Sequence, residues 1–112
     1  MRRLQNITSE PIQRHTILFE ESEIIFTLRF YPRTQVWLFD AAFGGKQVYG
    51  LKLSIGVLHM LSQNQPFDFI CIDRSGNGID PFQRQDFSSG RCDIYMLEAG
   101  EMELIRGTEV AF

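Results

Sequence analysis

The sequence is poor in the residues that build metal centres and disulfide frameworks, and it has no long apolar run. Its 112 residues include two cysteines and two histidines. A structural zinc site takes four ligands, so two cysteines alone cannot complete one. A membrane-spanning helix needs roughly 20 consecutive apolar residues, and no segment approaches that length. We therefore expect no metal, no cofactor and no membrane partner.

The two cysteines are expected to act as small buried hydrophobes. Cys71 and Cys92 each lie within an apolar, strand-like run, FDFICID and RCDIYML, where free thiols usually pack as apolar groups. A disulfide is geometrically possible if the two strands are neighbours. The first residues, MRRLQNITSEPIQ, show no apolar core or cleavage site of a signal peptide. Synthesis in the cytoplasm is therefore expected, and it argues against a disulfide.

Basic residues are too few and too scattered to favour nucleic acid. The formal net charge is −3, and the 11 lysines and arginines are spread along the chain. Binding to a phosphate backbone usually requires a basic patch or stripe. A barrel that binds single strands also exposes aromatic side chains flanked by basic ones, whereas the aromatic residues here alternate toward one face. We expect no nucleic-acid partner.

Apolar patterning predicts a packed, mainly β protein. Hydrophobic residues make up 44% of the chain and include 10 phenylalanines. From Arg14 to Phe30 they alternate with period two, as in a half-buried hairpin. Turns are expected at Glu20-Glu21-Ser22, Pro32-Arg33-Thr34 and Gly44-Gly45. Four strands in meander order result, the third containing Val36 to Phe39 and the fourth running from Val48 to Ile55.

The second half of the chain adds a helix and two more strands. Residues 56–63 are predicted to form two helical turns that plug an open end of the sheet. Strands are expected at Phe67 to Asp73 and at Cys92 to Leu97, separated by a long polar loop. The tail after Glu98 is expected to be a weak strand or an extended arm. The prediction is thus one domain, residues 1–112, with its core at about 12–98: an antiparallel β-barrel or sandwich of six to seven strands with one short helix.

One loop begins like a calcium site but does not complete it. Asp73-Arg74-Ser75-Gly76-Asn77-Gly78 has oxygen-bearing side chains at its first, third and fifth positions and glycine at the sixth. The twelfth position, which should supply a bidentate carboxylate, is Arg84. We interpret the segment as a turn cluster that binds no metal.

The remaining ionisable residues do not form a catalytic set. Asp80, Asp86 and Asp93 are the best candidates for paired-carboxylate chemistry, but the turn residues around them favour a role in anchoring the loop. His15 and His59 have no Ser, Cys or carboxylate at a catalytic spacing. We expect the protein not to be an enzyme.

Segments spread over most of the chain resemble one family. Taken in order they are VWLFDAAFGG, YGLKLSIGVLHML, FDFICIDRSGNGIDPFQRQDFSSG and CDIYML. Over about residues 12–98 they resemble the small baseplate plug proteins of contractile-tailed phages, typified by a cyanophage baseplate plug. The most telling parts are Trp37 before Asp40, the spacing from Gly50 to Gly56, and Asp80-Pro81 followed by Asp86-Phe87 and Gly90. The family tends to show a leucine pair after the second glycine, where this chain has VLHML.

The resemblance implies a structural virion component of the tail baseplate. Such a protein is made in the host cytoplasm and packs near the tail-tube axis, in multiple copies, with hub, spike and tube-proximal proteins. The residues alone predict a small all-β interaction domain, so a general protein-interaction module remains the alternative. A nucleic-acid-binding barrel and an enzyme are less favoured.

The long loop, residues 74–89, and the two chain ends are the predicted docking surfaces. Aromatic and arginine side chains are enriched among interface anchors. The residues selected on this basis are Phe82, Arg84 and Phe87 in the loop, Arg2 and Arg3 at one end, and Val110 and Phe112 at the other. An alternative for Phe82 and Phe87 is that they seal the barrel. Trp37, in the longest apolar run, is predicted to lie in the core.

Overall fold

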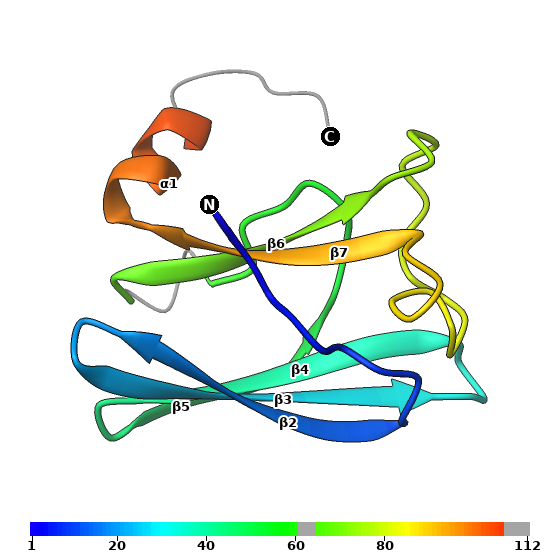
Figure 1. Cartoon of the computed structure of the whole chain (residues 1–112), viewed down its shortest axis with the longest axis horizontal. Coiled ribbons are helices and arrows are strands. Elements are labelled where there is room, and N and C mark those ends of the chain that lie inside the picture. Colours follow the sequence, from blue (N-terminus) through cyan, green and yellow to red (C-terminus); the bar gives the residue numbers. More distant parts are fainter. Residues whose placement is uncertain (61–64, 107–112) are drawn as a thin grey trace.

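The chain folds into two antiparallel β-sheets stacked face to face, with one helix against the smaller sheet (Figure 1). The computed structural model describes residues 1–60 and 65–106, the last four as backbone only. The strands are β1 (Arg2–Arg3), β2 (Ile12–Phe19), β3 (Ser22–Tyr31), β4 (Val36–Phe43), β5 (Lys46–Lys52), β6 (Phe67–Asp73) and β7 (Cys92–Glu98), and the helix is α1 (Ala99–Arg106). No strand pairing joins the two sheets within these ranges, so the predicted mainly β fold is confirmed as a sandwich.

The larger sheet is a four-stranded meander in the order β2-β3-β4-β5. Its first and last hairpins close on two-residue turns, Glu20-Glu21 with φ of 49° and 65° and Gly44-Gly45 with φ of 57° and 79°. Two consecutive positive φ values define the turn whose twist matches that of the flanking strands. The middle turn is held by the Gln35 N–H, which donates to the Tyr31 carbonyl at 2.8 Å. All three predicted turns are therefore confirmed.

The smaller sheet has the order β1-β7-β6 and joins the two ends of the chain. Arg2 pairs with Met96 and Arg3 with Tyr95. The next residue, Leu4, is buried, and its N–H donates to the Ile94 carbonyl at 2.8 Å. The core was predicted to begin at about residue 12, and the structure corrects this bound because the pairing with β7 brings Leu4 into the core.

The predicted helix at residues 56–63 is absent from the part of it that the structure describes, residues 56–60; residues 61–63 lie outside the described ranges. Gly56 has a φ of 72°, which is left-handed, and its N–H donates to the Cys71 carbonyl of β6. The Met60 N–H donates to the Asp68 carboxylate at 2.9 Å. The Asp68 carboxylate thus replaces the Gly56 carbonyl to which the Met60 N–H would donate in a helix. The segment instead runs along the free edge of β6, where Ile55 forms a parallel bridge with Cys71.

The helix is found where a weak strand or an arm was expected. At its start the Glu101 carboxylate accepts from the Glu98 N–H at 3.2 Å, as in a capping box. Met102 packs on Ile70 and Leu97, on the side of the smaller sheet that faces away from the sandwich. Gly100 lies within the helix and lowers its intrinsic helix propensity. The helix is therefore stabilised mainly by this packing contact.

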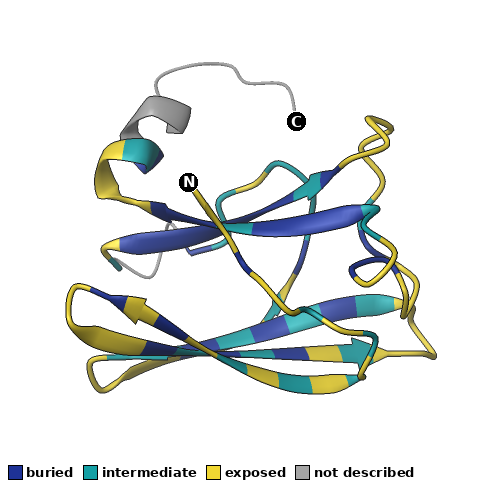
Figure 2. Ribbon diagram, viewed as in Figure 1, coloured by how far each residue is buried: buried dark blue, intermediate teal, exposed yellow. Residues whose placement is uncertain are grey.

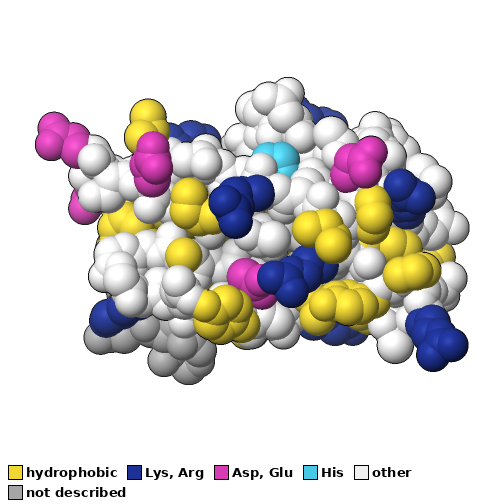
Figure 3. Space-filling model, turned by 90° about the horizontal axis from the view of Figure 1, so that it is seen from below, with side chains coloured by type: hydrophobic (Ala, Val, Ile, Leu, Met, Phe, Trp, Pro, Cys, Tyr) yellow, Lys and Arg dark blue, Asp and Glu magenta, His cyan; other side chains and the backbone are white. Residues whose placement is uncertain are grey.

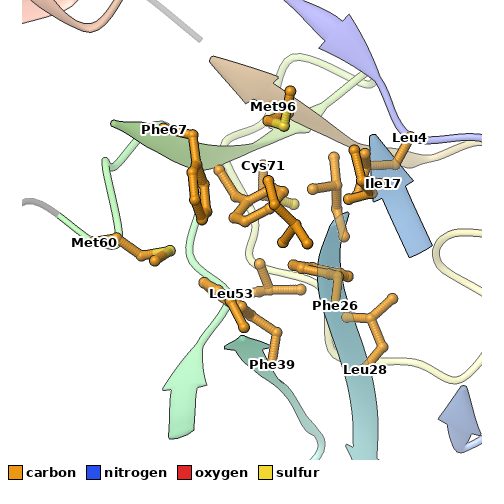
Figure 4. Close-up of a cluster of buried hydrophobic side chains, with 14 of the residues drawn as sticks. Leu4, Ile17, Phe26, Leu28, Phe39, Leu53, Met60, Phe67, Cys71 and Met96 are labelled. Carbon is orange, nitrogen blue, oxygen red and sulfur yellow. The ribbon is translucent and has the colours of Figure 1, made fainter. Parts of the chain in front are cut away.

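The core fills the space between the two sheets (Figures 2 and 4). Trp37 is fully buried, as predicted, and its indole N–H donates to the Gln83 carbonyl at 3.0 Å. Phe26 lies between the sheets, with ring centroids 5.1 Å from Phe39 and 4.6 Å from Phe69. Figure 4 shows further side chains converging on the same space from both sheets and from Leu53, which follows β5: Ile17, Leu28, Phe67, Cys71 and Met96.

Candidate protein-interaction surface

The long loop that was predicted to dock partners is fixed from inside by carboxylates. The Asp73 carboxylate accepts from the Ser75 hydroxyl at 2.6 Å and from the Ile79 N–H at 3.0 Å. The Asp86 carboxylate accepts from the Phe82 and Gln83 N–H groups, both at 2.7 Å. These contacts give Asp86 the anchoring role that its sequence context indicated.

Arg91 connects these two carboxylates. Its guanidinium makes a bidentate contact with Asp86, at 2.9 and 3.0 Å, and lies 3.2 Å from Asp73. It also donates to the carbonyls of Ile79 and Asp80. Every polar group in this network has an internal partner, which is the arrangement of a structural anchor rather than of an acid–base pair poised for a substrate.

The pKa values of the two anchoring carboxylates follow from these contacts. The hydrogen bond from the Ser75 hydroxyl is the main cause that lowers the pKa of Asp73 to about 2. Burial by itself raises the pKa of Asp86, but hydrogen bonds from Arg91 and from two backbone N–H groups outweigh it and leave that pKa below its usual range. Both groups are therefore carboxylates near neutral pH, and neither can serve as a proton donor there.

The resemblance of this loop to a calcium site does not extend to its geometry. The Asp73 oxygens face backbone and hydroxyl donors of their own loop. In the described residues, no group of three or more His, Cys, Asp or Glu side chains is arranged to hold a metal ion.

The three predicted docking residues of the loop lie in different environments. Phe82 is 38% exposed. The Arg91 guanidinium lies over its ring, with the guanidinium carbon 5.5 Å from the centroid of the Phe82 ring. Arg84 is exposed, and its Nε donates to the Ser9 carbonyl at 2.7 Å. Phe87 is buried and meets the Trp37 indole edge-on at 5.2 Å. The sealing role considered for Phe87 fits this position, whereas Phe82 and Arg84 remain accessible to a partner.

At the N-terminal end Arg2 and Arg3 are exposed, but both side chains already have partners within the chain. The Arg2 guanidinium donates to the Leu18 carbonyl at 2.5 Å, and Arg3 pairs with the buried Asp93 at 3.2 Å. Val110 and Phe112 lie outside the described residues.

The histidines and cysteines are also used internally. His59 accepts from the Ser54 N–H at one ring nitrogen and contacts the Phe69 carbonyl with the other, at 2.9 and 2.8 Å. Burial is the main cause of its lowered pKa. Cys71 and Cys92 lie on neighbouring strands, and both are free, buried thiols. A hydrogen bond with Cys92 and burial raise the pKa of Cys71, so it is a poor nucleophile.

The main surface that sequence reasoning missed is the outer side of the larger sheet, which we call the open face. Figure 3 shows apolar side chains and arginines interspersed over it. Exposure there reaches 72% for Ile12, 66% for Leu18 and Tyr49, and 43% for Tyr31. The strand register places the following residues on this face: Ile12, Arg14, Leu18, Ile25, Arg29, Tyr31, Leu38, Asp40 and Tyr49. So many large side chains on the solvent side of one sheet are typical of a binding surface.

The open face has a polar centre. The Arg29 guanidinium pairs with Asp40 on the adjacent strand at 2.6 Å, and the other Asp40 oxygen accepts from the Gly50 N–H at 2.8 Å. A depression of about 360 Å³ surrounds this pair, with Arg14 and Tyr49 on its walls. Because Arg29 is already paired, Arg14 is the cation of this depression that the described residues leave without an ion pair.

A second hollow links the open face to the loop. It has a volume of about 450 Å³ and is lined by Val36 and Lys52 of the sheet and by Ile79 and Phe82 of the loop. Ile79 is 48% exposed. Phe82, which was predicted from the sequence as a docking residue, therefore lies at the edge of the open face, whose residues were not predicted.

Comparisons with known proteins do not place the chain in a family. No family model matches it, and no curated protein is a detectable relative. Within the described residues, no helix is long and apolar enough to span a bilayer.

Proposed function

We propose that this protein is a non-catalytic structural component of a larger protein assembly and that it binds its neighbours through the open face and the adjoining hollow at Phe82. The observation that carries the proposal is the exposure of Ile12, Leu18, Tyr31 and Tyr49 on one side of one sheet. Tyr and Arg are over-represented in interface cores, and large apolar side chains gain most from leaving water.

The polar residues of the molecule support the same reading. Its buried carboxylates Asp68, Asp73 and Asp86 accept hydrogen bonds from its own backbone. The depression on the open face holds a satisfied ion pair, Arg29 with Asp40, and no nucleophile beside a base. A surface of this kind offers contact area and a few fixed charges, which are the requirements of binding rather than of bond-making chemistry.

The assembly that we propose is the baseplate of a contractile phage tail. The segments that resemble baseplate plug proteins support this choice, and the partners are then hub, spike and tube-proximal proteins in a virion. A domain with one uncovered sheet face suits such a position because assembly removes that face from water and stabilises the folded chain. A general interaction module of another assembly is the alternative.

The test is incorporation into tails. Tails are assembled with the wild-type chain or with a variant, purified, and probed for the chain by quantitative mass spectrometry. The double variant Leu38→Ser/Tyr49→Ser should fold alone and be depleted from tails at least tenfold. Phe82→Ser/Arg84→Ser should act in the same direction at the edge of the surface.

The matched control is Val57→Ser, which changes a side chain that is 46% exposed but lies outside the open face. It should be incorporated like the wild type. Normal incorporation of both double variants would contradict the docking surface. The alternative function would be favoured by a different result: the wild-type chain is absent from purified tails, but it binds another protein and loses that binding when Tyr49 is substituted.

A further inference from the structure

The edges of the two sheets are protected to different degrees. The edge of β6 is covered by residues 55–59, and β1 is two residues long. The edge strand β5 carries a bulge near Gly50 and has Lys46 and Lys52 at its ends. Bulges and lysines are devices that discourage pairing with another chain. In contrast, β2 is eight residues long and regular, with neither lysine nor proline.

The backbone groups that β2 turns outward can be identified. The Phe30 N–H of β3 donates to the Pro11 carbonyl at 2.7 Å, which places the odd-numbered residues in hydrogen bonds with β3. Because backbone direction alternates along a strand, the even-numbered residues point their N–H and C=O groups away from the sheet. The contact from Arg2 to the Leu18 carbonyl confirms that direction. The outward-pointing residues are Ile12, Arg14, Thr16 and Leu18.

We infer that β2 pairs with β2 of a second copy of this chain, antiparallel, to form one continuous eight-stranded sheet across two molecules. One register matches all four outward-pointing residues, with Ile12 opposite Leu18 of the second copy and Arg14 opposite Thr16. The two-fold axis then passes through His15. This inference goes beyond the proposed function, because it concerns a contact between identical copies through the edge of β2, at which Ile12 and Leu18 of the open face also lie.

Self-complementarity is the argument for a second copy rather than another strand. In the free chain Ile12 and Leu18 are 72% and 66% exposed, six residues apart on the same side of β2. The register brings each against the other across the new pairing, so two exposed apolar side chains of one copy cover the same two of its partner. Shifting the register by two residues places Arg14 opposite Arg14 or opposite Leu18, which loses this match.

Arg2 has a defined place in this inference. In the free chain its guanidinium occupies the Leu18 carbonyl, which is the acceptor that the Ile12 N–H of the second copy would use. Arg2 therefore competes with self-pairing, and its removal should strengthen the contact.

The experiment is sedimentation equilibrium of the full chain over a concentration series. We expect a reversible monomer–dimer equilibrium in the wild type and tighter association in Arg2→Ala. Thr16→Pro removes an outward N–H that β3 does not need, so it should remain folded by circular dichroism and be monomeric. A wild type that stays monomeric up to about 1 mM, or a Thr16→Pro variant that still dimerises, would overturn the inference.

A charge exchange tests the register. Ile12→Lys or Leu18→Glu alone should weaken association by about tenfold or more. The double variant Ile12→Lys/Leu18→Glu should restore it, because the introduced lysine of one copy then faces the introduced glutamate of the other. The restored association should weaken as salt is added. Failure of the double variant to associate more tightly than either single variant would reject this register even if Thr16→Pro failed to fold.

Discussion

The two sheets of the sandwich differ in how many of their faces the chain covers. In the smaller sheet Ile70 and Leu97 point away from the interior and are still fully buried, because Met102 and Leu58 lie over them. In the larger sheet the corresponding side carries Tyr49, which is 66% exposed. Figure 2 shows the contrast, with the upper layer mostly dark blue and the lower layer alternating with yellow. The chain thus uses its helix to cover the outer side of one sheet and leaves the outer side of the other exposed.

The buried carboxylates follow the same division. Asp68, Asp73 and Asp93 lie on strands of the smaller sheet, and Asp86 lies in the loop between them. On the open face, Asp40 pairs with the partly exposed Arg29. Charges on the covered sheet therefore hold the chain's own loops, whereas those on the open face remain within reach of another molecule.

The largest effect should come from the core that both sheets share. Trp37→Ala removes a fully buried indole and its hydrogen bond to Gln83, so the free energy of unfolding should fall by about 3–5 kcal/mol. Chemical denaturation measures it. A loss below about 1 kcal/mol would place the ring outside the core and would contradict a core shared by both sheets.

The next largest effect should distinguish the outer side of the smaller sheet from that of the larger sheet. Met102→Ala should lower the free energy of unfolding by about 2 kcal/mol, because it uncovers Ile70 and Leu97 on the smaller sheet. Tyr49→Ala, on the open face, should change it by no more than about 0.5 kcal/mol. Equal effects of the two substitutions in denaturant titrations would show that the outer sides are not energetically different.

A smaller effect concerns acid. The folded pKa of Asp73 is about 2, below the ordinary value of 3.8. A depressed carboxyl pKa stabilises the fold above the unfolded value, and that stabilisation is lost as pH falls through the folded value. Unfolding of the wild type should therefore become easier between about pH 4 and pH 2.

Asp73→Asn is the variant that isolates this contribution. It should be less stable than the wild type near neutral pH, and the difference between the two should shrink over the same acid range. Burial raises the pKa of Asp68, which affects the pH dependence of stability in the opposite sense. That contribution is the same in the wild type and in Asp73→Asn, so it cancels in their difference. A difference that stays constant with pH would assign the acid sensitivity to other groups.

The smallest effect should be that of calcium. Since Arg84 stands where a calcium loop needs its last carboxylate, thermal unfolding with calcium and with a chelator should coincide. A ligand that binds only the folded chain must raise the melting temperature. A rise of several degrees with calcium would show that the loop between β6 and β7 binds a metal ion.

The strands were predictable because their information is local. Alternation on either side of Glu20-Glu21, and the Gly44-Gly45 pair, define the meander without knowledge of the rest of the chain. The helix was not predictable in this way. Residues 56–60 are held by Asp68 and by the Cys71 carbonyl, and α1 is held by its packing on Ile70 and Leu97, so the deciding contacts cross between elements.

The candidate surface was predictable only in part. Phe82 and Phe87 have the same side chain and share one loop, and only the contact with Trp37 shows that Phe87 belongs to the core. The open face did leave a signal. Ile12, Ile25 and Leu38 fall on the strand phase opposite to the core phenylalanines, which makes that phase too apolar for a face meant only for water.

The pairing of β1 with β7 bears on how the protein is made. Arg2 pairs with Met96, and the Leu4 N–H donates to the Ile94 carbonyl, so the segment ahead of β2 has no strand to join until β7 has left the ribosome. The β2–β5 meander needs only pairings between neighbouring strands, which close quickly. We expect the meander to form during synthesis and β1 to join its sheet only after β7 has been made.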